Sequence, residues 1–396
     1  MWLQLHVYQV SPTLTIIENT TARTFASLFG LTGPHAGGTT QPGGSAWNTT
    51  ALVVARNAMF PETKVDGNIG KKFVLFTSAH GHYSFEKAAQ ICGFGSSNAW
   101  AVPVDAQGRM DVSELVRLIR RAREEGLTPL FVNTTAGTSF FGAYDPLPEI
   151  AEVCKRENLW FHVDASWGGA AILSSKQRHT LRGSKFADSL TVNPHEMMGV
   201  PLTCSFLLGA DMRKSQQANT LPAGYLFHGN AAEDVSQNGA ESSEPENTSR
   251  DPEIWDLGDL TLQCGRKGDS LKLALGWIYY GSCGYEAQID AAFDTAAHLA
   301  SLVDAHPDLM LLSENPPPCL QMCFYVGGDR ALAGEKEKNS WRTKEIARRL
   351  VGRGFMVDYA PGEFGLFFRA VVHVNTRYAT MESLVNIVVK IGASLE

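Results

Sequence analysis

Hydrophobic and polar positions follow two alternating patterns between residues 40 and 210. Short apolar runs rich in β-branched and aromatic residues predict strands, and apolar residues three and four positions apart predict helices. Strands are expected at 73–77, 130–133, 159–163, 189–192 and 204–208, and helices at 46–59, 112–119 and 146–156. This alternation favours a mostly parallel sheet that is covered on both faces. Ligands of such sheets bind beyond the carboxyl ends of the strands.

The pattern changes after residue 228. Segment 229–253 is acidic and rich in Ser, Asn, Gly and Pro, which is typical of a mobile surface loop. Beyond it we expect helices at 269–281, 287–305, 344–351 and 381–391, and strands at 321–326 and 367–372. The chain therefore divides into a shortened N-terminal segment (1–35), a large α/β domain (36–268) and a small C-terminal α+β domain (269–396).

Composition and charge narrow the function classes. The 396 residues are 44% hydrophobic and 19% charged, as in a globular enzyme. The formal net charge of −7 gives no basic footprint, so we expect no nucleic-acid partner. Seven cysteines without a C-x-x-C pair indicate free thiols in a reducing compartment, and no apolar run is long enough for a membrane span. We expect a cytoplasmic protein without a membrane partner.

A glycine-rich turn at 37–45 runs into the helix expected from residue 46. Small residues let the backbone approach an anion, and a helix N-terminus offers unpaired N–H groups. The alternative is a plain glycine loop, because the segment has neither a Walker sequence nor G-x-G-x-x-G.

Two further candidates follow predicted strands. His82 lies just after the strand at 73–77 and would lie flat over an aromatic ligand; the alternative is a capping histidine. Asp164 comes directly after the strand expected at 159–163. A buried carboxylate at this strand end needs a partner such as a pyridinium N–H. The alternative for Asp164 is a structural cap of the next turn.

The segment Asn193-Pro194-His195-Glu196 closes another strand with turn chemistry, and it presents His195 and Glu196 at the same edge. Other catalytic classes lack support. The chain has no G-x-S-x-G elbow, and its loop histidines His80, His82 and His162 form no helix-borne metal motif. We expect no metal.

A series of motifs resembles the group II pyridoxal-phosphate (PLP) decarboxylases, above all glutamate and cysteine-sulfinate decarboxylases. The resemblance rests on segments that occur in order over nearly the whole chain: 42–45, 82–84, 133–138, 162–169, 193–199, 223–227, 262–266 and 367–369. It implies PLP fold type I, the aspartate-aminotransferase-like architecture. It also implies a homodimer with active sites at the subunit interface and a small-molecule carboxylate substrate.

The resemblance also implies roles for single residues. His82 would stack on the pyridine ring and Asp164 would pair with the ring nitrogen. Gly44 and Ser45 would help to hold the phosphate, with a contact near Gly265 from the partner chain. Thr135 and His195 would line the ring and its substituents. Arg369 would bind the substrate carboxylate.

The chain departs from this family at several points. Glu196 stands where the family has the lysine that forms the Schiff base, and a carboxylate cannot form one. Ser166 replaces a small apolar residue behind the ring. Glu233 stands in place of a loop tyrosine, and the chain begins late by the standard of the family. These departures argue against conventional amino-acid decarboxylation.

Two hypotheses of function remain. The first is a repurposed enzyme of specialised metabolism (a lyase, a cyclase or a C–C bond enzyme) that uses Glu196 and His195 as acid–base groups, with His82 beside them. Such a site would hold PLP or pyridoxamine phosphate (PMP) non-covalently. Alternatively, it would bind neither cofactor and would take another flat anionic substrate. The second is a catalytically inactive pseudoenzyme, or a regulatory partner of an active decarboxylase.

Overall fold

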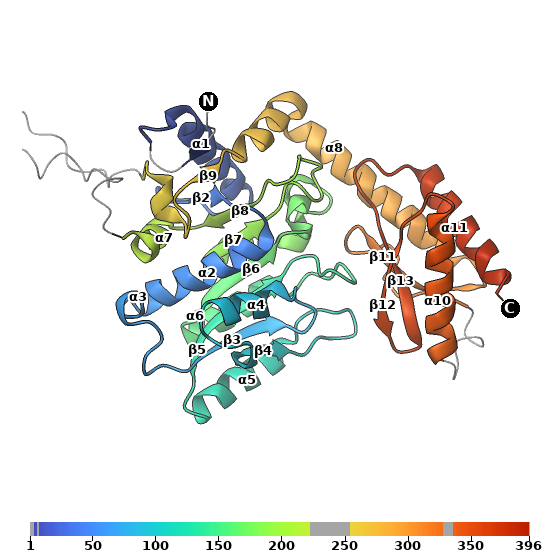
Figure 1. Cartoon of the computed structure of the whole chain (residues 1–396), viewed down its shortest axis with the longest axis horizontal. Coiled ribbons are helices and arrows are strands. Elements are labelled where there is room, and N and C mark those ends of the chain that lie inside the picture. Colours follow the sequence, from blue (N-terminus) through green and yellow to red (C-terminus); the bar gives the residue numbers. More distant parts are fainter. Residues whose placement is uncertain (1–3, 6–7, 222–253, 328–335, 396) are drawn as a thin grey trace, which may run out of the picture.

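The computed structural model describes residues 4–5, 8–221, 254–327 and 336–395. The acidic segment at 229–253 and the motif at 223–227 lie outside these residues, as does Glu233. Figure 1 shows a large sheet with helices on both faces, and a smaller sheet beside it that carries its own helices. The long helix α8 runs from the first part to the second. The division of the chain at residues 35 and 268 stays a prediction.

The large sheet has seven strands in the order β2-β8-β7-β6-β5-β3-β4. The strands from β7 to β4 are parallel, and β8 and β2 are added in antiparallel pairs. The expected mostly parallel sheet is confirmed. Its strands are β2 (Gly37–Thr40), β3 (Phe73–Ser78), β4 (Ala99–Val102), β5 (Thr128–Thr135), β6 (Trp160–Ala165), β7 (Ser189–Val192) and β8 (Phe206–Gly209).

Alternating residues of each strand feed two separate cores. Phe73 and Leu75 pack toward one face, whereas Val74 and Phe76 pack toward the other, and all four are buried. The first face is covered by α2 (Gly44–Met59), α4 (Ser84–Ile91) and α7 (Met212–Asn219), with the short α3 (Thr63–Asp66) after α2. The second is covered by α1 (Pro12–Leu28), α5 (Val112–Glu124) and α6 (Leu147–Glu157).

The prediction of a glycine-rich turn over 37–45 was wrong for its first four residues. Gly37–Thr40 form strand β2, which pairs antiparallel with β8. A side chain on Gly38 would meet the carbonyl oxygen of Leu207, so glycine here allows a close approach of two strands. The helix after the turn begins at Gly44 and not at residue 46.

The smaller sheet is antiparallel, in the order β10-β11-β13-β12. Its helices α10 and α11 pack against it (Figure 1). The two helices expected at 269–281 and 287–305 form one element that kinks at Gly281, where φ is 67°. The elements are α8 (Ser270–Asp304), β10 (Leu309–Leu311), β11 (Gln321–Val326), α10 (Lys336–Val351), β12 (Asp358–Gly362), β13 (Gly365–Val371) and α11 (Tyr378–Ala393).

A buried ion pair joins the N-terminal helix to a short strand near the end of the large domain, and its carboxylate also bonds to β2, the strand that precedes α2. Glu18 of α1 and Arg266 are 2.9 Å apart, with side chains that are 0% and 2% exposed. Arg266 belongs to β9 (Arg266–Lys267), which pairs with β1 (Gln4–Leu5). Glu18 also accepts hydrogen bonds from the Thr39 hydroxyl and from the backbone N–H and hydroxyl of Thr40. The pair therefore fixes the end of β2, close to the start of α2.

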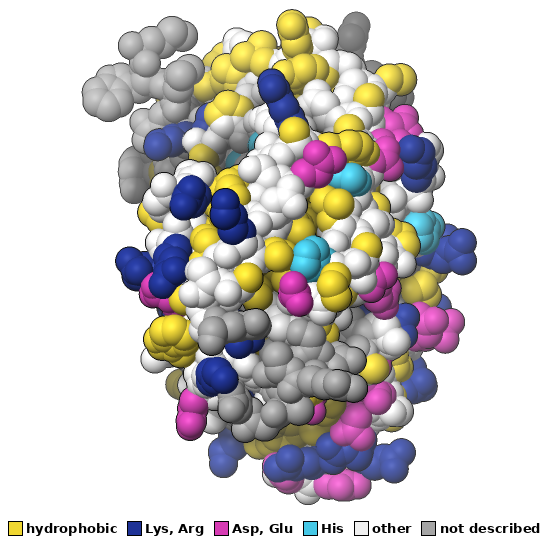
Figure 2. Space-filling model, turned by 90° about the vertical axis from the view of Figure 1, so that its right-hand side faces the viewer, with side chains coloured by type: hydrophobic (Ala, Val, Ile, Leu, Met, Phe, Trp, Pro, Cys, Tyr) yellow, Lys and Arg dark blue, Asp and Glu magenta, His cyan; other side chains and the backbone are white. Residues whose placement is uncertain are grey.

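The surface is mixed in charge on the face shown in Figure 2, where basic and acidic side chains are interspersed. Apolar side chains gather at the upper end of this face. In Figure 1 this end carries α1 and the first part of α8. Within the described residues, no helix is long and apolar enough to cross a membrane.

Candidate active site

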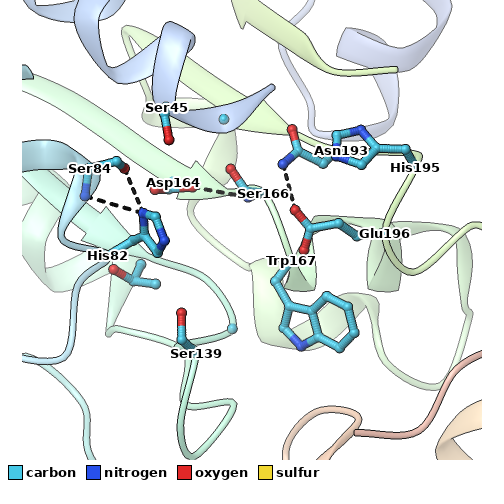
Figure 3. A pocket seen from close by; sticks show the side chains of 13 residues that line it. Ser45, His82, Ser84, Ser139, Asp164, Ser166, Trp167, Asn193, His195 and Glu196 are labelled. Atoms are coloured by element: carbon cyan, nitrogen blue, oxygen red, sulfur yellow. Dashed lines mark hydrogen bonds between the residues drawn. The ribbon is translucent and has the colours of Figure 1, made fainter. Parts of the chain in front are cut away.

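A cavity of about 280 Å³ opens at the carboxyl ends of β5, β6 and β7. This is the edge at which ligands of parallel sheets bind. Figure 3 shows His82 and Asp164 on one side of it and His195 and Glu196 on the other. The lining residues are Gly44, Ser45, His82, Ser84, Thr135, Gly137, Ser139, Asp164, Ser166, Trp167, Asn193, His195 and Glu196.

The N-terminus of α2 forms one wall. Gly43 caps this 16-residue helix with φ at 106° and has no side chain to cap its first amides. Gly44 leaves room that a side chain would fill, because a Cβ there would lie 2.8 Å from Ser166 Oγ and 3.2 Å from Asn193 Nδ2. Unpaired N–H groups at the positive end of a helix dipole suit an anionic group such as a phosphate.

Asp164 lies near the end of β6 with only 6% of its surface exposed. Its Oδ1 accepts a hydrogen bond from the backbone N–H of Ser166 at 3.1 Å. His162 lies two residues earlier on the same strand, and burial lowers the pKa of His162 to about 4. His162 is therefore neutral at pH 7 and does not balance the charge of Asp164.

A chain of hydrogen bonds orients His82. The amide of Asn48 donates to Ser84 Oγ at 2.8 Å, and Ser84 Oγ lies 2.7 Å from His82 Nδ1. The backbone N–H of Ser84 also donates to Nδ1 at 3.3 Å. Because Nδ1 accepts, the ring carries its proton on Nε2.

Glu196 is held by the turn that follows β7. Its Oε1 accepts a 2.6 Å hydrogen bond from Asn193 Nδ2, and the hydroxyl of Ser205 donates to Oδ1 of Asn193. Burial raises the pKa of Glu196 above its ordinary value, and the negative charge of Asp164 adds to this. The Asn193 hydrogen bond and the neighbouring His195 act in the opposite direction on the pKa.

Three more groups complete the cavity. His195 Nδ1 lies 2.6 Å from the backbone oxygen and 3.1 Å from the backbone nitrogen of Cys204, which leaves Nε2 for a ligand. The hydroxyl oxygens of Thr135 and Ser166 are buried and have no hydrogen-bond partner among the described residues. Buried hydroxyls are nearly always paired, so these two indicate a bound group or water.

Two of the predicted site residues are not among those that line this cavity. Arg369 of β13 donates to the backbone oxygen of Ser139 at 2.7 Å and pairs with Asp358 at 3.0 Å. It thus supports the loop that carries Ser139, which does line the cavity. Gly265 is exposed, in the turn before β9. The role of each residue stays a prediction.

The structure adds residues that the sequence had not singled out as site residues. Ser84 fixes His82, and Asn193 fixes Glu196. Trp167 lies below Glu196 in Figure 3, and its Nε1 donates to Gln321 of β11 at 2.7 Å. All three lie in segments that carry the family resemblance, and Asn193 also begins the Asn-Pro-His turn at a strand end. No group of three His, Cys, Asp or Glu that could hold a metal occurs in the described part of the chain.

The family follows from a match over most of the chain. Residues 4–326 match the model of the pyridoxal-dependent decarboxylase conserved domain, and the chain belongs to this family. The mouse CSAD crystal structure is similar over 99% of this chain and 78% of its own, with 31% identity and a TM-score of 0.87. The expected α/β architecture of PLP fold type I is confirmed.

Two curated relatives are similar over almost the whole chain. The first is the L-aspartate decarboxylase dtxS4 of Metarhizium robertsii, 50% identical over 96% of this chain and 72% of its own length. The second is a glutamate decarboxylase-like protein of Gibberella zeae, 39% identical over 98% of this chain and 79% of its own length. The two names refer to decarboxylases of aspartate and glutamate, which are both acidic amino acids.

Proposed function

We propose that this chain is a repurposed member of the decarboxylase family. In this proposal the cavity binds a phosphorylated pyridine cofactor, PLP or PMP, without a covalent bond. Glu196 and His195 then act as acid–base groups on a small amino-acid or carboxylate substrate. The reaction classes that suit such a site are lyase, cyclase and C–C bond chemistry in specialised metabolism.

The observation that carries the proposal is the environment of Asp164. It is a buried carboxylate on the cavity wall, and no lysine or arginine lies among the described residues that line the cavity. A buried charge with no cation opposite it is costly, so this wall favours a cationic ligand group. A protonated pyridine nitrogen meets this need and carries a directional N–H.

The other walls fit the remaining parts of the same cofactor. Gly44 and Ser45 would hold its phosphate at the start of α2, and His82 would lie against its ring. The unpaired hydroxyls of Thr135 and Ser166 would bond to its polar atoms. When bound, the group would supply an electron sink for a carbanion next to an amino nitrogen. Glu196 offers no amine for a covalent link.

Glu196 and His195 would move protons. Oε1 of Glu196 is occupied by Asn193, so Oε2 would give or accept the proton. Because the pKa of this carboxyl group is raised, it lies closer to neutral pH, where a general acid or base works best. On His195 the anchored Nδ1 leaves Nε2 for exchange with a substrate.

The class of substrate is inferred from the relatives and from Arg369. The relative from Metarhizium robertsii is named an L-aspartate decarboxylase, so we infer a small amino acid or a related carboxylate. Arg369 would bind the substrate carboxylate in place of one of its present partners. At present it holds the Ser139 loop and Asp358.

A homodimer is part of the proposal. Ile278 and Tyr279 in the first part of α8 are 82% and 81% exposed, and Leu275 and Tyr280 beside them are 56% and 48% exposed. An exposed apolar cluster of this kind marks an interaction surface. A second copy of the chain would bury it and bring its Gly265 to the phosphate.

Native mass spectrometry and visible absorbance of the purified protein test the proposal. The protein is incubated with PLP and separately with PMP, and Glu196→Lys is measured alongside. Retention of either cofactor by the wild type supports the proposal, and retention without turnover of any amino acid would favour a regulatory partner. If only Glu196→Lys takes up PLP, the native cavity serves another ligand and the proposal is wrong.

A further inference from the structure

The charges around Glu196 are unbalanced. The described residues that line the cavity include two carboxylates, Asp164 and Glu196, and neither lysine nor arginine. A ring nitrogen would balance Asp164 and leave Glu196 without a cation. The carboxylate of Glu196 receives one neutral donor, the Asn193 amide, on Oε1.

The surrounding protein does not supply the missing charge in the described residues. The guanidinium group of Arg369 is engaged by the Ser139 carbonyl oxygen and Asp358. His195 is anchored through Nδ1 to the backbone of Cys204. His195 is close enough to lower the pKa of Glu196. Neither Arg369 nor His195, however, has a hydrogen bond to Glu196 in the described residues, so a directly bonded cation would have to come from the ligand.

The two forms of the proposed cofactor differ at one position. The aldehyde form carries an uncharged oxygen that accepts hydrogen bonds, and this oxygen would face a carboxylate that also only accepts. The amine form carries an ammonium group with three N–H donors and a positive charge. An ion pair between this ammonium group and a carboxylate is a charge-assisted hydrogen bond, the stronger kind.

From this balance of charges we infer that Glu196 is the counter-ion of a primary ammonium group on the ligand. The cavity therefore selects the amine form of the phosphorylated pyridine over the aldehyde form. The inference rests on the proposed function, because it assumes that the cavity binds this cofactor.

Equilibrium binding of three probes tests the inference. PMP, PLP and pyridoxine 5′-phosphate share the ring and the phosphate, and they carry an ammonium, an aldehyde and a neutral hydroxyl group. We expect the wild type to bind PMP at least tenfold more tightly than either of the others, which is about 1.4 kcal/mol. Isothermal titration and quenching of protein fluorescence both measure this without turnover.

Variants at one position separate the charge from the shape of the side chain. Glu196→Gln should bring the three affinities to within about threefold of one another, and Glu196→Asp should keep part of the preference. Glu363→Gln removes an exposed carboxylate from the turn between β12 and β13 and should leave the preference unchanged. Equal binding of PLP and PMP by the wild type, or a PMP preference that survives Glu196→Gln, overturns the inference alone. Failure of all three probes to bind overturns the proposed function as well.

Discussion

The side-chain amide of Asn193 donates a 2.6 Å hydrogen bond to Oε1 of Glu196, three residues further along the same turn. The hydroxyl of Ser205, at the start of the segment leading into β8, donates to the oxygen of the same amide. This relay fixes the direction of the amide and leaves Oε2 of Glu196 available to a ligand. It connects a buried strand end to the carboxyl group of Glu196 on the cavity wall.

Asn193→Leu should raise the pKa of Glu196 further, because it removes a donor that favours the carboxylate. Binding of an amine needs the carboxylate, so PMP affinity should be lost at a higher pH than in the wild type. Titration of PMP affinity between pH 4 and 8 measures the shift. The other ionisable groups whose charges interact with Glu196 are His195, Asp164 and Cys319.

Ser205→Ala is the matched control for Asn193→Leu. It removes the donor that orients the Asn193 amide but keeps the amide itself. The midpoint pH at which PMP affinity is lost should move in the same direction as in Asn193→Leu, by a smaller amount. A midpoint that moves to lower pH in Asn193→Leu contradicts a stabilising role of the amide.

Glu196→Gln should stabilise the protein without ligand. The pKa of Glu196 is higher in the folded chain than in the unfolded chain, so protonation favours folding. This contribution is complete below the unfolded value and is lost as the pH rises through the folded pKa. The variant should therefore melt about 2 °C higher than the wild type at pH 8, the size of a change of roughly 1 kcal/mol.

The pH dependence distinguishes this effect from simple repacking. The difference in melting temperature between Glu196→Gln and the wild type should vanish near pH 4, where both side chains are neutral. Glu363→Gln, which is exposed, should show no comparable gain at either pH. A gain that stays constant from pH 4 to pH 8 would point to packing and not to charge.

The sequence predicted the sheet well because its strands are buried on both faces. The runs Phe73–Ser78 and Trp160–Ala165 are each apolar at four of six positions and buried at all six. Strand β2 was missed because Gly37 and Gly38 have a low intrinsic preference for strands. Its pairing with β8 depends on close packing, which a local pattern does not reveal.

The candidate site could be predicted in part for a similar reason. Thr135, Asp164 and the His195–Glu196 turn lie at or just beyond the carboxyl ends of three neighbouring parallel strands, so their meeting at one edge is a consequence of topology. The supporting contacts were not predictable, because Ser84 and Ser205 act through side-chain geometry that has no periodic signature. The present engagement of Arg369 by Asp358 depends on the register of β12 and β13.

Gly44→Ala should weaken ligand binding about tenfold or more. The new Cβ would lie 2.8 Å from Ser166 Oγ and 3.2 Å from Asn193 Nδ2, so one wall of the cavity must move. Isothermal titration with PMP measures the loss. Gly352→Ala is the control, since its Cβ would meet only an ordinary contact, 3.6 Å from the backbone oxygen of Arg349.

Ser166→Ala tests whether this clash and the free hydroxyl belong to the same site. The hydroxyl is buried without a partner in the described residues, so its loss should lower PMP affinity by about fivefold if it bonds to the ligand. In the double variant the penalty of Gly44→Ala should shrink, because the nearest atom to the new Cβ is gone. Two independent penalties, with a coupling below about 0.5 kcal/mol, would contradict this arrangement.

Glu18→Ala should destabilise the protein by about 3–5 kcal/mol, because it leaves the buried guanidinium group of Arg266 without its counter-ion. Thr39 and Thr40 would lose their acceptor at the same time. Urea unfolding measures the change in the free energy of unfolding. The control is Glu114→Ala, which removes an exposed pair with Arg117 at 2.7 Å and should cost less than about 1 kcal/mol. Comparable losses in the two variants would mean that the buried pair contributes no more than a surface pair. A large loss in Glu18→Ala alone would show that the buried pair contributes far more to stability than the surface pair does.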